Sequence, residues 1–244
     1  MIELKKKILQ LSNKANEGHI ASSFSILDIL WVLYNEILDL NRDKFILSKG
    51  HASLALYSIL NYKKYITDEE FESFCKFDSI LGGHANSNKI NGVVASTGSL
   101  GHGLPIATGI AFSNKILKNE SKVYCLIGDG ELNEGSNWES IMFASNHELS
   151  NLCCIVDYNH SGDRALKLNN ICDKFNSFDW EFASIDGHNH LQIFNAITQP
   201  HKKPLAIIAN TIKGKGCQLM ESNPEWHHKA PNNEELKILL DQLK

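Results

Sequence analysis

The chain has 244 residues, of which 43% are hydrophobic and 21% are charged, so it can bury a substantial core and we expect one domain over residues 1–244. Its formal net charge of -4, without a run of basic residues, argues against a nucleic-acid partner. No apolar stretch approaches the ~20 residues of a membrane span, and the N-terminus lacks a signal-peptide core. We therefore expect a cytoplasmic protein with no membrane partner. Its 6 cysteines lack metal-ligand spacing and are expected to be free and mostly buried.

The chain begins with segments that are predicted to be helical. Apolar residues recur at helical spacing among the lysines of residues 2–16, which predicts an amphipathic opening helix. A loop is expected over residues 17–23. Ser25 followed three residues later by Asp28 is typical of a capping box, which predicts a buried helix over residues 26–38.

Two further helices and a long loop are predicted before the middle of the chain. One helix is expected after His51, and another after Thr67, where Glu70 completes a second capping box. The glycine-rich residues 82–103 predict an extended loop. Pro105 suits the first turn of the helix that follows, because its missing N–H would be unpaired there.

The second half of the chain alternates between strand and helix patterns, which favours an α/β fold: a parallel sheet with helices on both faces. The strand patterns are continuously apolar, as expected when both faces of a sheet are covered. Strands are predicted over residues 123–127, 152–156, 181–185 and 205–209, with helices over residues 136–147 and from residue 191 onward.

The strand that begins at residue 123 ends in Gly128-Asp129-Gly130, and the next strand ends just before Asn159. A right-handed crossover would place both side chains at the carboxyl edge of the sheet, where open α/β sheets bind ligands. Mg²⁺ takes ~six oxygens and combines a few protein groups with phosphates. Asp129, the Asn159 amide oxygen and a backbone carbonyl near Ser161 therefore predict a metal-bound diphosphate.

A Gly-Asp-Gly sequence followed about thirty positions later by Asn resembles the thiamine diphosphate motif, and its surroundings resemble transketolase. The resemblance implies the diphosphate-binding type of domain, with thiamine diphosphate as cofactor and Mg²⁺, or Ca²⁺ or Mn²⁺, as metal. The matching segments occur in family order along nearly the whole chain, at residues 17–19, 47–52, 82–84, 96–101, 128–130, 186–188, and 213–216 through 226–227.

The resemblance also implies roles for single residues. The metal would be held by Asp129, Asn159 and Ser161. The cofactor would be bound by His51, Gly98, Ser99, Leu100, Gly128, Asp129, Gly130, Glu131, Asn159 and His227. The histidines of the active-site channel would be His19, His51, His84 and His227, and Glu134 would support a catalytic glutamate of the partner.

Transfer of a two-carbon ketol unit from a ketose or its phosphate to an aldose or its phosphate is the activity that this resemblance implies. In the family a pyrimidine-binding domain provides the glutamate that protonates the cofactor, and the sequence ends near Lys244, before such a domain would begin. We therefore expect the partner to be a separate pyrimidine-binding, C-terminal transketolase subunit, in a heterotetramer.

Several alternatives remain open from the sequence. A 2-oxo acid dehydrogenase component or a deoxyxylulose phosphate synthase would share the metal motif, and a scaffold subunit could retain it without turnover. Asp129 could cap a helix, and Glu134 could be a solvated first-turn residue. Residues 213–216, Lys-Gly-Lys-Gly, lack the spacing of a nucleotide P-loop and are expected to be a flexible segment near the mouth of the site. Trp226 is expected to anchor that segment in the core.

Overall fold

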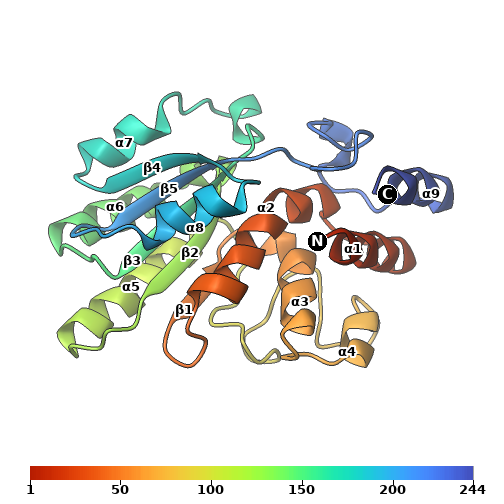
Figure 1. Ribbon diagram of the computed structural model, residues 1–244, viewed down its shortest axis with the longest axis horizontal. Coiled ribbons are helices and arrows are strands. Elements are labelled where there is room, and N and C mark those ends of the chain that lie inside the picture. Colours follow the sequence, from red (N-terminus) through yellow and green to blue (C-terminus); the bar gives the residue numbers. More distant parts are fainter. Residues whose placement is uncertain (244) are drawn as a thin grey trace.

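The computed structural model describes residues 1–243, which are arranged around a five-stranded parallel sheet (Figure 1). The strand order is β1-β2-β3-β5-β4, and every pairing is parallel, as the sequence predicts. The strand at the first edge was not expected, because its four residues are too short to stand out as a pattern. The strands are β1 (Lys44–Leu47), β2 (Val123–Gly128), β3 (Leu152–Tyr158), β4 (Glu181–Asp186) and β5 (Leu205–Asn210).

Helices cover both faces of the sheet, which confirms the predicted fold class. Two apolar clusters result, one on each face, because alternate side chains of each strand point to opposite sides. All six cysteines are free and four are buried, as expected. One face packs against α2 (Ile20–Val32) and α8 (His190–Thr198), and α3 (Ser53–Tyr62) packs against α2. The other face packs against α5 (Gly103–Ile116), α6 (Gly135–Asn146) and α7 (Ile171–Ser177).

Three further helices lie away from the sheet, on the right of Figure 1, where they pack against α3 or against one another. The second of them begins with the predicted capping box: Glu70 N–H donates to Thr67 Oγ1 at 3.1 Å, and Thr67 N–H donates to Glu70 Oε2 at 2.7 Å. The helices α7 and α9 were not expected from the sequence. The three are α1 (Ile2–Ala15), α4 (Asp68–Glu72) and α9 (Asn233–Gln242).

The predicted start of the second helix is wrong. α2 begins at Ile20, inside the expected loop, and a π-helical turn at Leu33–Ile37 continues it. Ser25 is therefore in the middle of the helix, where its hydroxyl donates to Ser22 O at 2.9 Å and contacts the carboxylate of Asp157 at 2.7 Å. A Ser-x-x-Asp pattern cannot distinguish a cap from two buried polar residues that bond to distant elements.

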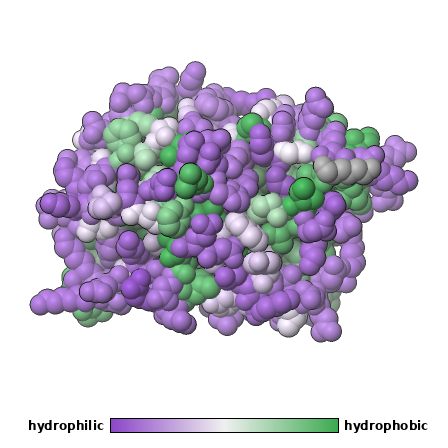
Figure 2. All heavy atoms as spheres, viewed as in Figure 1, coloured by the Kyte–Doolittle hydropathy of each residue, from purple (hydrophilic) through white to green (hydrophobic). Residues whose placement is uncertain are grey.

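The stretch Ile20–Ile37 has the length and apolar composition of a membrane-crossing helix, which was not expected from the sequence. In the structure 72% of that window is buried inside the protein, between the sheet and neighbouring helices, so it serves as a core helix. On the face shown in Figure 2, polar side chains cover most of the surface and apolar atoms form only small patches.

Candidate active site

The five parallel strands end at one edge of the sheet, and each is followed by a polar residue of the candidate site or its supports. Asp129 and Asn159 follow the neighbouring strands β2 and β3, whose register pairs Gly128 with Asp157. Both line a cavity of about 460 Å³, here called the histidine cavity, together with His19, His51, His84 and His227. The structure thus brings together the residues that the sequence placed at this edge.

Asp157, near the end of β3, organises the floor of the site. It is fully buried and pairs with Lys49, which follows β1 and is also buried. Ser25 and Thr211 donate hydroxyl hydrogen bonds to the same carboxylate, and Asn159 Nδ2 donates to it at 2.8 Å. Burial alone would raise the pKa of Asp157, but Lys49 and these donors lower it, so the carboxylate is ionised.

The side chain of Asp129 has the features of a cation ligand. Its Oδ1 accepts the Gly130 N–H at 2.7 Å, whereas Oδ2 is buried and lacks a hydrogen-bond partner among residues 1–243. Burial, and the nearby Asp157 carboxylate, raise the pKa of Asp129. A bound cation would relieve both effects, because it would neutralise the charge and occupy the free oxygen.

Asn159 is oriented with its amide nitrogen toward Asp157, so its Oδ1 faces the other way and accepts the Ser161 N–H at 3.1 Å. An amide oxygen has two lone pairs, which leaves one for a metal. The turn at Ser161 is held close to the Asp129 loop, since a Cβ on Gly162 would lie 2.7 Å from Gly130 Cα. The residues present therefore fit a hard divalent cation.

Two histidines of the cavity, His19 and His51, are held as neutral rings. The ring centroids of His19 and His51 are 5.0 Å apart, and those of His19 and His227 are 5.9 Å apart. Burial, with a nearby lysine, lowers the pKa of His51 to about 2, and burial with neighbouring histidines lowers that of His19 to about 4. Near neutral pH these rings can donate and accept hydrogen bonds without carrying charge.

The remaining predicted residues occupy different positions around the cavity. Gly98 and Leu100 line it, and the ring of His84 lies against Gly98. Ser99 and Glu134 are exposed and lie outside the cavity lining. Glu134, at the start of α6, is therefore accessible to another molecule.

Glu131 lines the cavity, and its carboxylate holds the loop of residues 98–101 in place. It is buried, and its carboxylate accepts the N–H groups of Gly101 at 3.0 Å and Gly128 at 3.2 Å and the hydroxyl of Ser48. Gly101 has φ +81°, and a Cβ there would lie 2.6 Å from Glu134 Cβ. Glu131 thus ties the Gly98-to-Gly101 loop to the strand ends.

Lys213 is a site residue that was not predicted from the sequence. The Lys213 ammonium is buried, 3.2 Å from Ser161 Oγ and 3.1 Å from His227 Nδ1. Burial, with the positive charge of Lys49, lowers the pKa of Lys213 to about 8, and the Lys213 charge is the main cause of a lowered pKa at His227. The signal that could have indicated Lys213 is its place just beyond β5, at the same sheet edge as Asp129.

The segment that carries Lys213 and His227, residues 211–232, is fixed by contacts with distant elements. Thr211 bonds to Asp157, and the Ile212 N–H donates to His188 Nε2 at 2.9 Å. Trp226 is 1% exposed, which confirms that it anchors the segment in the core. The expected flexible segment at residues 213–216 is instead a set of turns, with the Gly214 N–H donating to Ala21 O at 2.9 Å.

Comparison with known proteins gives the same family as the sequence motifs. Residues 6–243 match the family model described as transketolase, thiamine diphosphate binding domain. One subunit of the apulose-4-phosphate transketolase of Actinobacillus succinogenes is 35% identical, over 99% of this chain and 93% of that protein. One subunit of the 6-deoxy-6-sulfo-D-fructose transketolase of a Clostridium species is 33% identical, over 98% of this chain and 93% of that protein.

A solved structure agrees with this assignment. The crystal structure of transketolase from Campylobacter jejuni superposes with a TM-score of 0.92 at 32% identity, covering 98% of this chain and 41% of that one. The chain thus matches the two subunits over nearly their whole length and the longer transketolase over less than half. It belongs to the transketolase family and is a subunit of a transferase that uses thiamine diphosphate.

Proposed function

We propose that this chain is the diphosphate-binding subunit of a split transketolase that moves a two-carbon ketol unit from a ketose phosphate to an aldose or aldose phosphate. The observation that carries the proposal is the buried, unpartnered oxygen of Asp129 beside the oriented amide of Asn159, at the floor of a cavity lined by four histidines. A phosphorylated sugar as substrate is supported by the relative that is named for apulose-4-phosphate.

Magnesium and the cofactor would be held at the strand ends. Asp129 Oδ2, Asn159 Oδ1 and the Ser161 carbonyl would ligate Mg²⁺, and the remaining positions suit diphosphate oxygens and water. Gly130 and Lys213 would donate to the diphosphate, and Gly98 and Leu100 would lie beside the rings of the cofactor. When bound, thiamine diphosphate stabilises the negative charge left on the transferred two-carbon unit.

The histidines of the cavity would bind the sugar and carry its protons. Because His227 Nδ1 accepts from the Lys213 ammonium, its Nε2 carries the hydrogen and donates. His19 and His51, whose pKa values lie below neutral, can accept a proton from a sugar hydroxyl and return it. His84, at the exposed mouth, is placed to exchange protons with the entering substrate.

A pyrimidine-binding partner subunit would complete the site and provide the glutamate that protonates the cofactor. Support comes from the relatives that this chain spans over 93% of their length, which are named as subunits. Glu134 is exposed beside the cavity loop and would support that glutamate across the contact. The assembly would be a heterotetramer in the cytoplasm, by analogy with the symmetric assemblies of such enzymes.

The proposal is tested with Asp129→Ala in the complex of this chain with its partner. Cofactor affinity, measured by calorimetry with Mg²⁺ and thiamine diphosphate, should fall at least about 100-fold, because loss of even an outer-shell contact to a metal site costs about 10- to 100-fold. Melting temperature should not fall, since the substitution removes a buried carboxylate oxygen, Oδ2, that has no hydrogen-bond partner among residues 1–243. Asp173→Ala, which removes an exposed aspartate on α7, is the matched control and should bind normally.

Three results would overturn the proposal. Unchanged cofactor affinity in Asp129→Ala would remove Asp129 from the site. A wild-type complex that binds the cofactor but decarboxylates 2-oxo acids, with no ketol transfer between sugars, would assign it to another thiamine diphosphate enzyme. Binding without any turnover would identify a scaffold subunit.

A further inference from the structure

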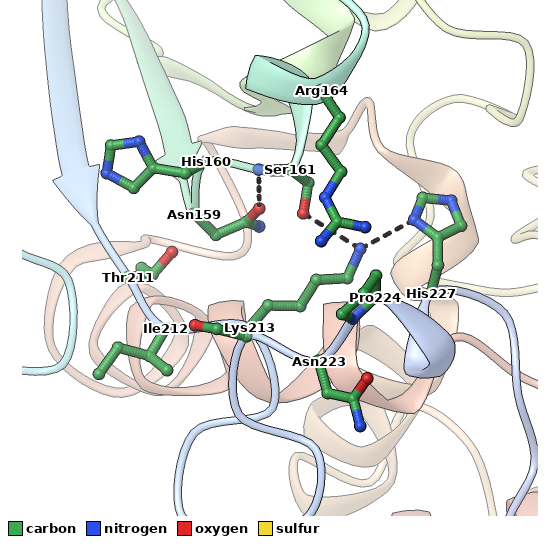
Figure 3. Close-up of a pocket in the computed structure, with 11 residues that line it drawn as sticks. Asn159, His160, Ser161, Arg164, Thr211, Ile212, Lys213, Asn223, Pro224 and His227 are labelled. Carbon is green, nitrogen blue, oxygen red and sulfur yellow. Dashed lines mark hydrogen bonds between the residues drawn. The ribbon is translucent and has the colours of Figure 1, made fainter.

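A second cavity adjoins the histidine cavity on the side of the metal site (Figure 3). This cavity of about 430 Å³, here called the cationic pocket, shares Asn159, Ser161, Lys213 and His227 with its neighbour. Arg164 lines only the cationic pocket, and no acidic residue is among the described residues that line it. A ligand held at Asn159 and Ser161 could therefore reach into it.

Arg164 has no partner of its own. It makes no hydrogen bond or ion pair with the part of the chain that the structure describes, residues 1–243. Asp163, the adjacent carboxylate, bonds instead to His160 Nδ1 at 3.0 Å. Asp157, a carboxylate near the shared lining, is paired with Lys49. The guanidinium donors of Arg164 therefore remain free to bind a ligand.

Figure 3 shows the guanidinium of Arg164 and the ammonium of Lys213 directed toward one another, with His227 beside them. The positive charge of Arg164 contributes to the lowered pKa values of Lys213 and His227, so these groups affect one another electrostatically. Two like charges that face one another in a partly enclosed pocket raise its free energy unless an anion lies between them. An anion with several oxygens would satisfy both donors.

We propose that Arg164 is a further binding residue for the cofactor, which contacts the terminal phosphoryl group of the diphosphate from the cationic pocket, opposite Lys213. This inference rests on the proposed function, because the metal site at Asp129 and Asn159 determines where the diphosphate begins. The turn that carries Arg164 is Gly162–Arg164, and Gly162 packs directly against Gly130. Arg164 is thus fixed relative to the metal site, and its planar fork suits two phosphoryl oxygens.

The phosphate of a sugar substrate has the same chemistry as a terminal phosphoryl group, so the experiment must separate the two sources. Arg164→Gln removes the charge, and Arg164→Lys retains it without the fork. Lys167→Gln is the matched control, because it removes one exposed positive charge from the same segment outside the pocket lining. Each variant is studied as the full chain in complex with its partner subunit.

Calorimetry with Mg²⁺ should show thiamine diphosphate bound about tenfold more weakly by Arg164→Gln, as expected for loss of one charge-assisted contact. Arg164→Lys should retain part of the affinity, and Lys167→Gln all of it. Thiamine monophosphate, which lacks the terminal phosphoryl group, should compete equally well with both the wild type and Arg164→Gln. Melting temperatures should be unchanged, because Arg164 is exposed and contacts no other residue through a hydrogen bond.

Equal affinity of the wild type and Arg164→Gln for thiamine diphosphate would overturn the inference. The inference would also be overturned if Arg164→Gln raised only the KM for a phosphorylated ketose and left the cofactor affinity unchanged. That result would assign the pocket to the phosphate of the substrate. If Arg164→Gln weakened the binding of thiamine monophosphate and thiamine diphosphate equally, Arg164 would act only as a nonspecific positive charge. Failure of the wild type to bind the cofactor would instead refute the proposed function, so the two failures are distinct.

Discussion

Two sides of the histidine cavity are held in place by different kinds of interaction. Asp129 and Asn159 follow directly on β2 and β3, and the parallel pairing of these strands fixes their separation. On the other side, residues 211–232 carry Lys213 and His227 with little regular structure beyond a short helical turn at Pro224–Trp226. This segment is positioned by side-chain hydrogen bonds and by the burial of its tryptophan.

The side that carries Asp129 and Asn159, here called the metal side, depends on backbone pairing, whereas the 211–232 side depends on a few side chains. The main-chain hydrogen bonds between β2 and β3 fix the positions of the metal side, and no single substitution removes them. The 211–232 side depends on contacts at Thr211, Ile212 and Trp226, each of which can be lost separately. Asp157 connects the two sides, because it bonds both to Asn159 and to Thr211.

Lys49→Met should have the largest effect, because it would leave the fully buried Asp157 without its cation. Removing one partner of a buried ion pair costs about 3–5 kcal/mol of unfolding free energy. Both sides of the cavity should be affected, since Asp157 joins them. Lys44→Met, in β1, is the control and should stay within about 0.5 kcal/mol in urea unfolding. A small effect at Lys49 would mean that Asp157 does not organise the floor.

His188→Ala should loosen only the 211–232 side. His188 Nε2 accepts the Ile212 N–H, and its Nδ1 donates to Asp28 at 2.9 Å. Loss of the ring leaves the amide unpartnered and should cost about 1–3 kcal/mol. Cofactor affinity should fall as well, because Lys213 follows Ile212, whereas the metal ligands should remain in place.

The matched control for this variant is His190→Ala. His190 also bonds to Asp28, at 3.0 Å, but it is 39% exposed and makes no contact with Ile212. Its removal should change stability by less than about 1 kcal/mol and leave the cofactor affinity unaltered. Equal effects of the two variants would show that Asp28, and not the link to Ile212, matters.

Stability should also depend on pH through His51. The pKa of His51 is about 2 in the folded chain against 6.5 without the fold, so the unfolded state takes up a proton first as pH falls. The contribution of His51 to the free energy of unfolding should be constant above pH 6.5. At pH values below 6.5 it should fall by up to about 1.4 kcal/mol per pH unit. His51→Gln should reduce that slope in urea titrations between pH 6 and pH 5. An unchanged slope would assign the acid sensitivity to other groups.

The metal side of the site could be predicted from sequence because its residues follow strands with a clear apolar pattern. On the 211–232 side His227 and the buried Trp226 were predicted, but Lys213 was not, since Lys-Gly-Lys-Gly has no recognised spacing and its position depends on the bonds that Thr211 and Ile212 make to Asp157 and His188. The same limit explains the wrong capping box. Ser25 and Asp28 find their partners 132 and 160 residues away, and no local pattern reports such contacts.

The other features that the sequence did not predict are a short strand and contacts between loops that are distant in the chain. The four residues of β1 were too few to give a periodic signal, so Lys49 was not recognised at the end of a strand. Resemblance to transketolase indicated which histidines to consider, but it could not show that Glu131 bonds to the cavity loop or that Arg164 faces Lys213. Those facts depend on how loops from distant parts of the chain meet.

The buried helix Ile20–Ile37 has a consequence for the synthesis of the chain. Its apolar sides are covered in part by α8, which begins at His190, so ribosomes make the helix long before they make its cover. At ~5–20 residues per second the delay is roughly 10 to 30 s. During that interval the side of the helix that α8 will cover is exposed in the nascent polypeptide, and we expect chaperones to bind there.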